Sequence, residues 1–382
     1  MLQTTGLRQR FGADSGSDRG KGEKMEKLKV AIVGCGRISA CYKDAFLKLA
    51  DRISVEYAVD KVEEKARDFA KDFSCRACTD IGEILDRDLD VVHLALPHFL
   101  HAPYSILLMR HGKNVLTEKP LAMTLQEADE MLKAEKETGK LLGCIFQTRY
   151  NASVQTLKKR LEEGVYGKIK TASSLLTWDR PDSYYEGSDW KGTWEYEGGG
   201  TIIDQAIHSI DRVRYIVGSD VEWVEASIFN RSHPRLFVED TAEAMVQFRN
   251  GVKYHLFATN TNGYDTPIQI EFCAENGRFG LVQDMGYSYL QEKYEEFREV
   301  KPSVTIGKDY WGTTHVMQLE DFYRAILEGK NPLVTGLEGR KTLEIVKAIY
   351  LSAKYRKRIS FPFTDEKLSA EEMRKLLFYP TN

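Results

Sequence analysis

The sequence lacks the features that mark secreted, membrane-spanning and nucleic-acid-binding proteins. No stretch approaches the ~18 to 20 consecutive apolar residues that a membrane span requires. The formal net charge is only −3 and there is no strongly basic block, which argues against nucleic acid as a partner. Six cysteines among 382 residues do not form the dense pattern of a disulfide framework. We therefore expect a cytoplasmic protein with reduced thiols and no membrane partner.

Zinc-type spacing is also missing. Cys75 and Cys78 stand three apart, but no second pair of cysteines or histidines follows at the distance of a zinc site. We expect no metal centre. Residues 1–26 are polar, rich in glycine and serine, and lack the apolar core of a secretory signal, so we expect a disordered extension with the natural start at or near Met25. At this length, the rest of the chain suits two domains.

What the sequence does contain begins with a strand, a glycine turn and a helix. The apolar run Leu28 to Val33 leads into Gly34-Cys35-Gly36-Arg37-Ile38-Ser39 and an amphipathic helix to about Leu49. The first glycine allows a tight turn, and the second lets the backbone approach a pyrophosphate at the helix N-terminus. Ser39 stands where a third glycine is usual. We expect Gly34, Gly36, Arg37 and Ile38 to bind a dinucleotide.

An acidic residue follows the second predicted strand. This strand, Ile53 to Val59, ends in Asp60, which is placed to accept hydrogen bonds from the adenosine ribose hydroxyls. A carboxylate repels a 2′-phosphate, so the sequence favours NAD over NADP, although the neighbouring Lys61 moderates this preference. The alternative is that Asp60 is an ordinary turn residue.

Alternation of strands and helices continues to residue 147. Strands at Val91–Leu96, Val115–Thr117 and Lys140–Phe146 complete a doubly wound parallel sheet, a Rossmann domain over residues 27–147. Ligands of such sheets bind at the carboxyl ends of the strands, so Pro97, His101, Glu118 and Lys119 are candidate cofactor contacts. A histidine at a helix start is usually structural, so we assign no catalysis to His98 or His101.

Lys119 carries a stronger functional signal. It stands between Glu118 and Pro120 at the end of a predicted strand, where the amine is held locally. An ammonium group there can donate to a substrate hydroxyl and stabilise the developing alkoxide. Taken alone, the residue is better interpreted as an ordinary surface lysine.

Residues 148–382 have a different pattern, with a polar helix followed by many strands. The predicted strands are Ile169–Thr177, Glu222–Phe229, Ala242–Phe248, Val252–Ala258, Ile268–Cys273 and Arg278–Val282. Turns such as Arg249-Asn250-Gly251 separate several of them, which predicts a large, mainly antiparallel open sheet. Helices near Val316–Glu328 and Leu337–Lys354 close the fold. One face of the sheet is expected to carry helices and the other to serve as an oligomer interface.

Aromatic residues alternate with charged residues in the stretch of the second domain that precedes Gly198. Tyr185, Trp190 and Trp194 lie among Asp, Arg and Lys side chains, a composition that suits sugar binding because rings stack on C–H faces. The same composition is equally consistent with an aromatic loop packed on the sheet. We take these three residues, together with Arg149, as candidate substrate contacts.

Gly198-Gly199-Gly200 introduces the helix that carries the candidate catalytic pair. The glycines permit a turn and a close approach of a ligand, and Asp204 and His208 stand one helical turn apart on one side. A histidine near a helix N-terminus is biased towards its neutral form, as a general base requires. The alternative is structural, with Thr201 as the N-cap and Asp204 as its capping-box acid.

From Lys27 to the C-terminus the sequence resembles the Gfo/Idh/MocA family of nicotinamide-dependent sugar and cyclitol oxidoreductases. The resemblance rests on Gly34-x-Gly36, Glu118-Lys119-Pro120, Gly198-Gly199-Gly200 and Asp204-x-x-x-His208 in the family's order and spacing. It implies a Rossmann domain followed by an α/β substrate domain, assembly as dimers or tetramers, and Lys119, Asp204 and His208 as the catalytic set, which also contacts the substrate.

The implied reaction is hydride transfer between a secondary hydroxyl of a sugar, glycoside or cyclitol and NAD. His208 takes the hydroxyl proton, Lys119 hydrogen-bonds the same oxygen, and Asp204 positions the substrate or the histidine. Two alternatives remain open within the family: a glycosidase that uses retained NAD for transient oxidation, and a sugar-sensing regulator without turnover.

Overall fold

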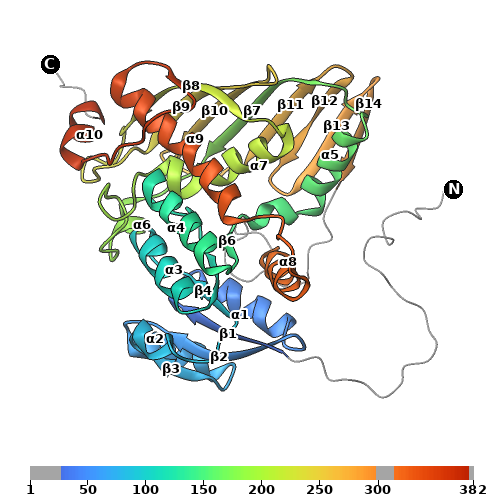
Figure 1. Cartoon of the computed structure of the whole chain (residues 1–382). Coiled ribbons are helices and arrows are strands. Elements are labelled where there is room, and N and C mark those ends of the chain that lie inside the picture. Colours follow the sequence, from blue (N-terminus) through green and yellow to red (C-terminus); the bar gives the residue numbers. More distant parts are fainter. Residues whose placement is uncertain (1–26, 298–313, 378–382) are drawn as a thin grey trace, which may run out of the picture.

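The first of two sheets is a six-stranded parallel sheet at the N-terminal end of the described chain. The computed structural model describes residues 27–297 and 314–377, so the extension expected to be disordered lies outside the described residues (Figure 1). The strands are β1 (Leu28–Val33), β2 (Ile53–Val59), β3 (Arg76–Cys78), β4 (Val91–Leu94), β5 (Asn114–Thr117) and β6 (Leu142–Cys144). Their order, β3-β2-β1-β4-β5-β6, reverses between β1 and β4, which confirms the predicted doubly wound fold.

Four helices connect these strands, and their boundaries follow local sequence signals. They are α1 (Ser39–Lys48), α2 (Glu63–Lys71), α3 (His101–Arg110) and α4 (Leu125–Thr138). The Thr124 hydroxyl accepts from the Glu127 backbone N–H at 3.1 Å, and the Glu127 carboxylate accepts from the Thr124 N–H, which forms a capping box. Gly139, in the left-handed conformation, ends the same helix. Recognisable capping residues therefore define both ends of α4.

The second sheet has nine strands in the order β14-β13-β12-β11-β7-β10-β9-β8-β15. The strands are β7 (Ile169–Thr177), β8 (Val221–Phe229), β9 (Thr241–Phe248), β10 (Lys253–Thr259), β11 (Gln269–Ala274), β12 (Gly277–Val282), β13 (Met285–Leu290), β14 (Lys293–Phe297) and β15 (Ile359–Ser360). Only β7 and β10 pair in parallel, so the sheet is mainly antiparallel as predicted. The sequence analysis missed β3, β13, β14 and β15.

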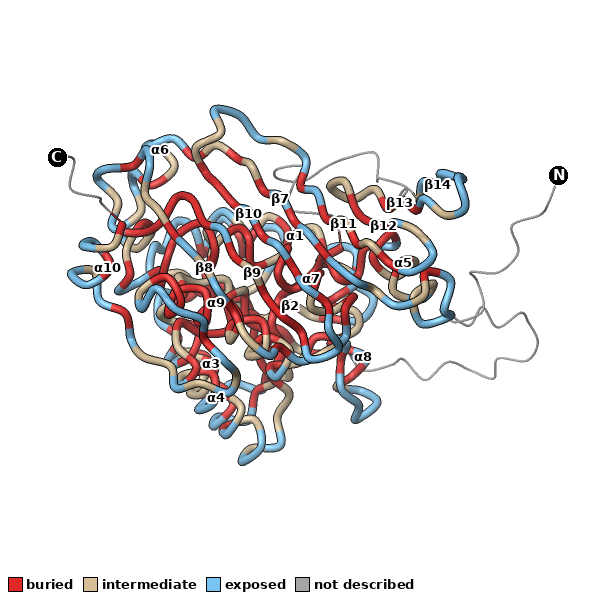
Figure 2. Tube along the Cα trace, turned by 90° about the horizontal axis from the view of Figure 1, so that it is seen from above, coloured by how far each residue is buried: buried red, intermediate tan, exposed pale blue. Residues whose placement is uncertain are grey.

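Helices cover one face of this sheet. The helices α5 (Ala152–Glu162), α7 (Ile207–Val217) and α9 (Gly336–Tyr355) pack against it, and the short α6 (Asp182–Tyr185) and α10 (Ala370–Leu377) lie at one end (Figure 1). Along β10, Tyr254 and Leu256 are buried beneath the helices while His255 and Phe257 are exposed on the opposite face. Figure 2 shows the same division, with the buried chain concentrated inside and exposed segments mostly in outer loops.

Helix α8 (His315–Glu328) returns from the C-terminal half to the first sheet. Phe322 and Tyr323 pack in one hydrophobic core with Tyr42 and Phe46 of α1. The Tyr323 hydroxyl also lies 2.7 Å from the His93 ring on β4. This contact ties the two halves together next to the carboxyl ends of the parallel strands.

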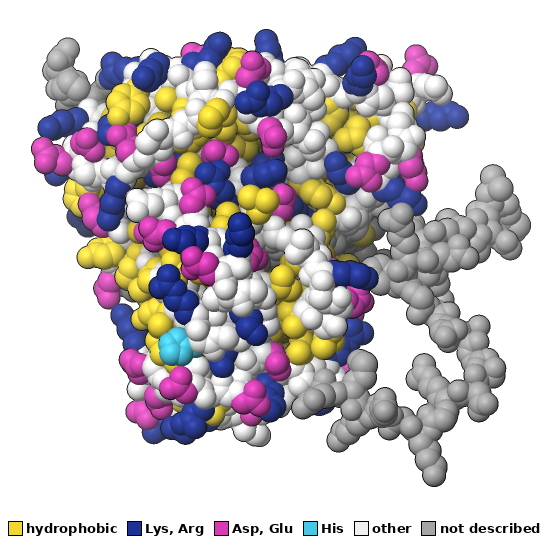
Figure 3. All heavy atoms as spheres, viewed as in Figure 1, with side chains coloured by type: hydrophobic (Ala, Val, Ile, Leu, Met, Phe, Trp, Pro, Cys, Tyr) yellow, Lys and Arg dark blue, Asp and Glu magenta, His cyan; other side chains and the backbone are white. Residues whose placement is uncertain are grey.

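Charged side chains of both signs are interspersed on the face shown in Figure 3, in keeping with the small net charge. Among the described helices, none is both long and apolar enough to cross a membrane. Within residues 27–297 and 314–377, no cluster of three or more histidine, cysteine or acidic side chains is arranged to hold a metal ion. All six cysteines are free thiols.

Candidate active site

The glycine turn after β1 has the geometry of a dinucleotide loop. Gly34 has φ +98°, and a Cβ there would lie 2.3 Å from the Ala95 carbonyl oxygen, so only glycine fits. A Cβ on Gly36 would meet no described atom within 4 Å, which leaves this position open to a ligand. Ser39 is buried and its hydroxyl donates to the Gly36 carbonyl at 2.7 Å. Ser39, at the position where a third glycine is usual, therefore stabilises the turn through this hydrogen bond.

Asp60 is attached to the same loop. Its carboxylate accepts from the Cys35 backbone N–H and from the Val62 N–H, each at 2.9 Å. These bonds hold the acid at the carboxyl end of β2, beside the glycine turn. The guanidinium of Arg37 lies 5.6 Å from the centre of the Tyr184 ring, so the cofactor loop reaches across to the second half of the chain.

The histidines after β4 are held by backbone carbonyls. Pro97 precedes the short turn His98–Leu100, and His101 is fully buried. The two ring nitrogens of His101 lie 2.7 Å from the Pro120 oxygen and 2.9 Å from the Leu96 oxygen. With both nitrogens occupied in this way, the His101 side chain fixes the surrounding loops and offers no free nitrogen to a cofactor.

Glu118 lies in a buried polar cluster between α1 and α8. Its carboxyl accepts from the Tyr42 hydroxyl at 3.1 Å and lies 3.9 Å from the His315 ring. Burial raises the pKa of Glu118 to about 7, despite the neighbouring Lys119 ammonium. The side chain is thus directed into protein, next to the candidate site.

Lys119, at the carboxyl end of β5, reaches across to the start of α7. Its ammonium group donates to the Asp204 carbonyl at 2.5 Å and to the Asp204 carboxylate at 2.9 Å. These two bonds bring together residues that are 85 positions apart in the sequence. Lys119 is therefore held at the strand end, but by Asp204 from the second half of the chain and not by its sequence neighbours as predicted.

The glycine triplet has a different role from the expected one. A Cβ on Gly199 would lie 2.1 Å from the Tyr350 hydroxyl, and one on Gly200 would lie 2.0 Å from the Glu239 carbonyl oxygen. Protein therefore fills the space on the side-chain side of Gly199 and Gly200, where the sequence had suggested room for a ligand. The triplet instead lets the chain pack tightly under the helix that follows.

That helix starts with a π-helical turn, Ile202–Ala206, and continues as α7. The Glu239 carboxylate caps it, accepting from the Gly200 and Ile202 N–H groups at 2.9 Å each. The Thr201 hydroxyl makes no capping bond and donates to the Asp240 carbonyl at 3.2 Å. The capping-box alternative for Thr201 and Asp204 is therefore wrong, which leaves the Asp204 carboxylate available to the site.

Asp204 is surrounded by donors. Besides Lys119, its carboxylate accepts from Lys191 at 2.9 Å, from the Tyr184 hydroxyl at 3.1 Å and from Gln205 at 2.6 Å. Burial alone would raise its pKa, but the two lysines hold the pKa of Asp204 well below its ordinary value. The group is a permanent anion and not a proton acceptor.

His208, on the first turn of α7, has the opposite environment. Its ring packs edge-on against Phe146, and its Nδ1 is buried with no hydrogen-bond partner in the described part of the chain. Burial, and then the Lys119 cation, lower the pKa of His208 well below its ordinary value. The imidazole is therefore neutral at pH 7 and able to accept a proton.

The aromatic candidates divide into two groups. Trp190 lies beside the site, with its ring centre 4.8 Å from that of His98 and 4.7 Å from the Lys191 ammonium. Tyr185 is buried and accepts from Asn260 at 3.4 Å, and Trp194 is buried with its indole N–H donating to the Phe237 carbonyl at 2.5 Å. The structure thus places Trp190 at the site, while Tyr185 and Trp194 support the loop from behind.

Arg149 is not part of this group. Its guanidinium is buried and bonds both oxygens of Asp211, at 2.6 and 2.7 Å, and Glu338 at 2.8 Å. These carboxylates compensate its charge inside the protein, so the side chain joins α7 and α9 and does not reach the site.

Of the four donors to the Asp204 carboxylate, only Lys119 was predicted from the sequence; Gln205 was missed, and so were Tyr184 and Lys191. Both lie in the aromatic, charged loop that the sequence analysis singled out. The directions of these two side chains could not be read from the sequence, because α6 is a single helical turn and Lys191 lies in an irregular loop, so neither shows a periodic pattern.

The fold and the site define an α/β oxidoreductase with a nucleotide-binding Rossmann sheet beside a lysine–aspartate–histidine cluster. Residues 28–146 match the oxidoreductase family with the NAD-binding Rossmann fold, and residues 154–280 match the GFO/IDH/MocA C-terminal domain. The chain belongs to the Gfo/Idh/MocA family, and its N-terminal domain binds NAD(H).

Relatives extend over most of the chain. Levoglucosan dehydrogenase of Pseudarthrobacter phenanthrenivorans is 26% identical, with 86% of this chain and 97% of the relative covered. D-glucoside 3-dehydrogenase of Escherichia coli is 25% identical, with 87% of this chain and 97% of the relative covered. The WlbA dehydrogenase of Bordetella pertussis, solved with NADH and UDP-GlcNAcA, is 28% identical with a TM-score of 0.78, covering 89% of this chain and 100% of that one.

Proposed function

We propose that this protein is an NAD-dependent dehydrogenase that oxidises a secondary hydroxyl of a sugar, glycoside or cyclitol. The observation that carries the proposal is the contact between Lys119, at the carboxyl end of a Rossmann strand, and Asp204, one turn before His208. Sugar and inositol dehydrogenases among the relatives support the substrate class.

In the proposed reaction, bound NAD supplies the hydride acceptor. The neutral His208 ring accepts the proton of the substrate hydroxyl, because its pKa is kept low by burial and by nearby cations. Lys119 has three N–H donors, of which two are bound to Asp204 and one remains for the substrate oxygen. Asp204 holds that ammonium in place and does not itself take a proton.

For the cofactor we propose NAD in preference to NADP, bound by Gly34, Gly36, Arg37, Ile38 and the strand-end residues Asp60 and Pro97. The support is the position of the Asp60 carboxylate beside the glycine turn, where it would meet the ribose hydroxyls and repel a 2′-phosphate. Residues 27–147 form the proposed cofactor domain and residues 148–382 the substrate and oligomerisation domain.

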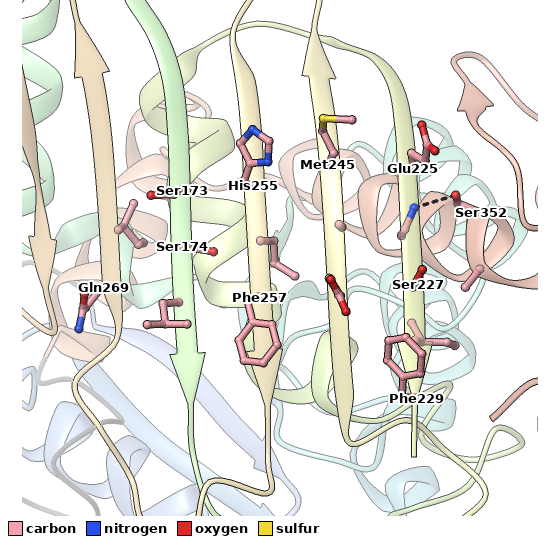
Figure 4. Close-up of a pocket in the computed structure, with 18 of the residues that line it drawn as sticks. Ser173, Ser174, Glu225, Ser227, Phe229, Met245, His255, Phe257, Gln269 and Ser352 are labelled. Atoms are coloured by element: carbon pink, nitrogen blue, oxygen red, sulfur yellow. Dashed lines mark hydrogen bonds between the residues drawn. The ribbon is translucent and has the colours of Figure 1, made fainter. Parts of the chain in front are cut away.

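For the assembly we propose a homodimer or homotetramer that joins through the exposed face of the larger sheet. Figure 4 shows Met245, His255 and Phe257 projecting side by side from neighbouring strands of this face. Phe257 lies opposite Leu175 in the register, and both are more than a third exposed, so association would remove apolar surface from water. Six free thiols support a reducing, cytoplasmic location.

The test is absorbance at the reduced-nicotinamide band with purified protein, added NAD and a panel of sugars, cyclitols and glycosides. We expect a rise with a subset of the panel and a weaker rise with NADP. If glycosides are cleaved without net NADH, or if no compound reacts although NAD binds, the proposed dehydrogenase activity is wrong.

A further inference from the structure

A second lysine, Lys191, contacts the Asp204 carboxylate at the oxygen that Lys119 does not bind. The Lys191 ammonium donates to one carboxylate oxygen at 2.9 Å, while Lys119 donates to the other at 2.9 Å. Lys191 comes from the loop between α6 and the π-helical turn, and its side chain is only 14% exposed. Asp204 thus lies between two half-buried cations from different parts of the chain.

The two lysines have different neighbours. Lys191 donates to Asp204 and to the Tyr184 hydroxyl at 3.1 Å, and its ammonium forms an ion pair with the Glu197 carboxyl at 3.5 Å. Lys119 donates only to the carbonyl and the carboxylate of Asp204. Protein groups from three residues therefore surround the Lys191 ammonium, which suits a role through its neighbours.

Resting on the proposed function, we propose that Lys191 is a positioning residue that neutralises Asp204 and keeps His208 a neutral base. With Lys191 present, the single negative charge of Asp204 is shared between two cations. Without it, Lys119 would be the only cation on the carboxylate and would be drawn more tightly to it. The Asp204 charge would also act on His208 with less compensation.

The direction of the effect follows from the groups that face His208. Burial lowers its pKa, as do the positive charges of Lys119 and Arg212 and the neighbouring His315, and Asp204 opposes them. Removing Lys191 strengthens the opposing group, so the pKa of His208 rises. Because oxidation needs the neutral ring, the acidic limb of the pH profile moves to higher pH. The carboxyl of Glu197 also faces Lys191, and burial raises its pKa, so it compensates little of the lysine charge.

The experiment follows the histidine Cε1 NMR signals of the NAD-saturated full-length protein against pH, with His208→Gln to assign the signal. In Lys191→Met and Lys191→Gln we expect His208 to protonate about one pH unit higher than in the wild type. Lys191→Arg should restore the wild-type behaviour. Lys347→Met, which removes another buried lysine paired with a carboxylate at 3.5 Å, should leave His208 unchanged.

The proposal is overturned if His208 titrates as in the wild type in a folded Met or Gln variant, or if the Lys347 variant produces the same shift. The NMR signal needs no turnover, so it separates this proposal from the proposed function. If no substrate reacts, the dehydrogenase assignment fails, but the NMR titration of His208 can still be measured and still tests the role of Lys191. If turnover is present but neither the titration nor the acidic limb moves, only the role of Lys191 is rejected.

Discussion

Asp204 and His208 lie one turn apart, yet their surroundings shift their pKa values towards opposite roles. Two ammonium groups keep the aspartate ionised, whereas burial and the positive charges of Lys119 and Arg212 keep the histidine neutral. Separation of two titratable groups in this way supports the proposed roles of Asp204 as the anchor and His208 as the base. Lys119 contributes to both effects, since it contacts the carboxylate directly and lowers the pKa of the imidazole.

Lys119→Met should lower kcat by roughly 10² to 10³, because it removes the donor to the reacting oxygen. The pKa of His208 should also rise, since a cation that lowers it is gone, and the acidic limb of the profile should move upward. Steady-state kinetics from about pH 5 to 9, roughly two units on either side of neutrality, measures both the fall in kcat and the shift of the acidic limb.

The matched control is Lys113→Met, at the opposite end of the same strand, where the ammonium donates to the Arg87 carbonyl. This variant should keep the wild-type profile. A Lys119 variant that retains both rate and profile would contradict the proposed role.

Asp60→Ser should reduce the preference for NAD over NADP. The variant loses both the repulsion of the 2′-phosphate of NADP and the hydrogen bonds to the ribose of NAD. The ratio of kcat/KM for NAD to that for NADP is the measurement, and we expect it to fall by about tenfold or more, equal to about 1.4 kcal/mol. Asp90→Ser, at the amino end of β4, provides the comparison. An unchanged ratio in Asp60→Ser would show that this carboxylate does not select the cofactor.

At the level of helices and loops, the start of α7 depends on a buried anchor. Glu239 caps the first N–H groups, its carboxylate accepts from the Tyr350 hydroxyl at 2.8 Å, and both pack directly on the glycine triplet. This anchor holds the π-helical turn that presents Asp204, and π-helical turns recur at functional sites.

Gly200→Ala should disturb this packing, since its Cβ would lie 2.0 Å from a backbone oxygen that cannot move aside. We expect a loss of about 1–3 kcal/mol in the free energy of unfolding, measured by urea denaturation, together with reduced activity. Gly286→Ala is the control, because its Cβ would have its nearest neighbour at 3.1 Å. Equal stability of the two variants would contradict the account of the triplet.

Much of the fold could be predicted from the sequence because its helices and strands carry strong periodicity and recognisable caps. The Rossmann strands are apolar runs that end in turns, and α4 is bounded by Thr124 and Gly139. The strand β14 was missed because its residues are almost all exposed and carry no alternating pattern. The π-helical turn was missed because Ile203 and Ile207 satisfy an α-helical spacing equally well.

Prediction of the site was limited by long-range contacts. Lys119, Asp204 and His208 were candidates from local sequence and became a catalytic set only through the family resemblance, and the structure brings Lys119 and Asp204 into contact. The burial of Arg149 against Asp211 and Glu338, by contrast, depends on partners 62 and 189 residues away, which no local pattern reveals.

At the scale of the whole molecule, no helix within residues 27–297 and 314–377 covers the outer face of the nine-stranded sheet, and we propose that a second copy covers it. Leu175→Glu, in the middle of this face, should weaken association because the interface would then bury a charge. Light scattering coupled to size-exclusion chromatography should show a smaller species than for the wild type. Leu327→Glu, on an exposed part of α8, should leave the mass unchanged. A monomeric wild type would contradict the proposed assembly.

The central claim is that His208 accepts the substrate proton while hydride passes to NAD. The most direct measurement is single-turnover absorbance at the reduced-nicotinamide band, comparing the wild type with His208→Ala and with His111→Ala, an exposed histidine on the first domain. We expect His208→Ala to bind NAD normally and to lose hydride transfer by several orders of magnitude, and His111→Ala to match the wild type. Wild-type hydride transfer in His208→Ala would contradict the account.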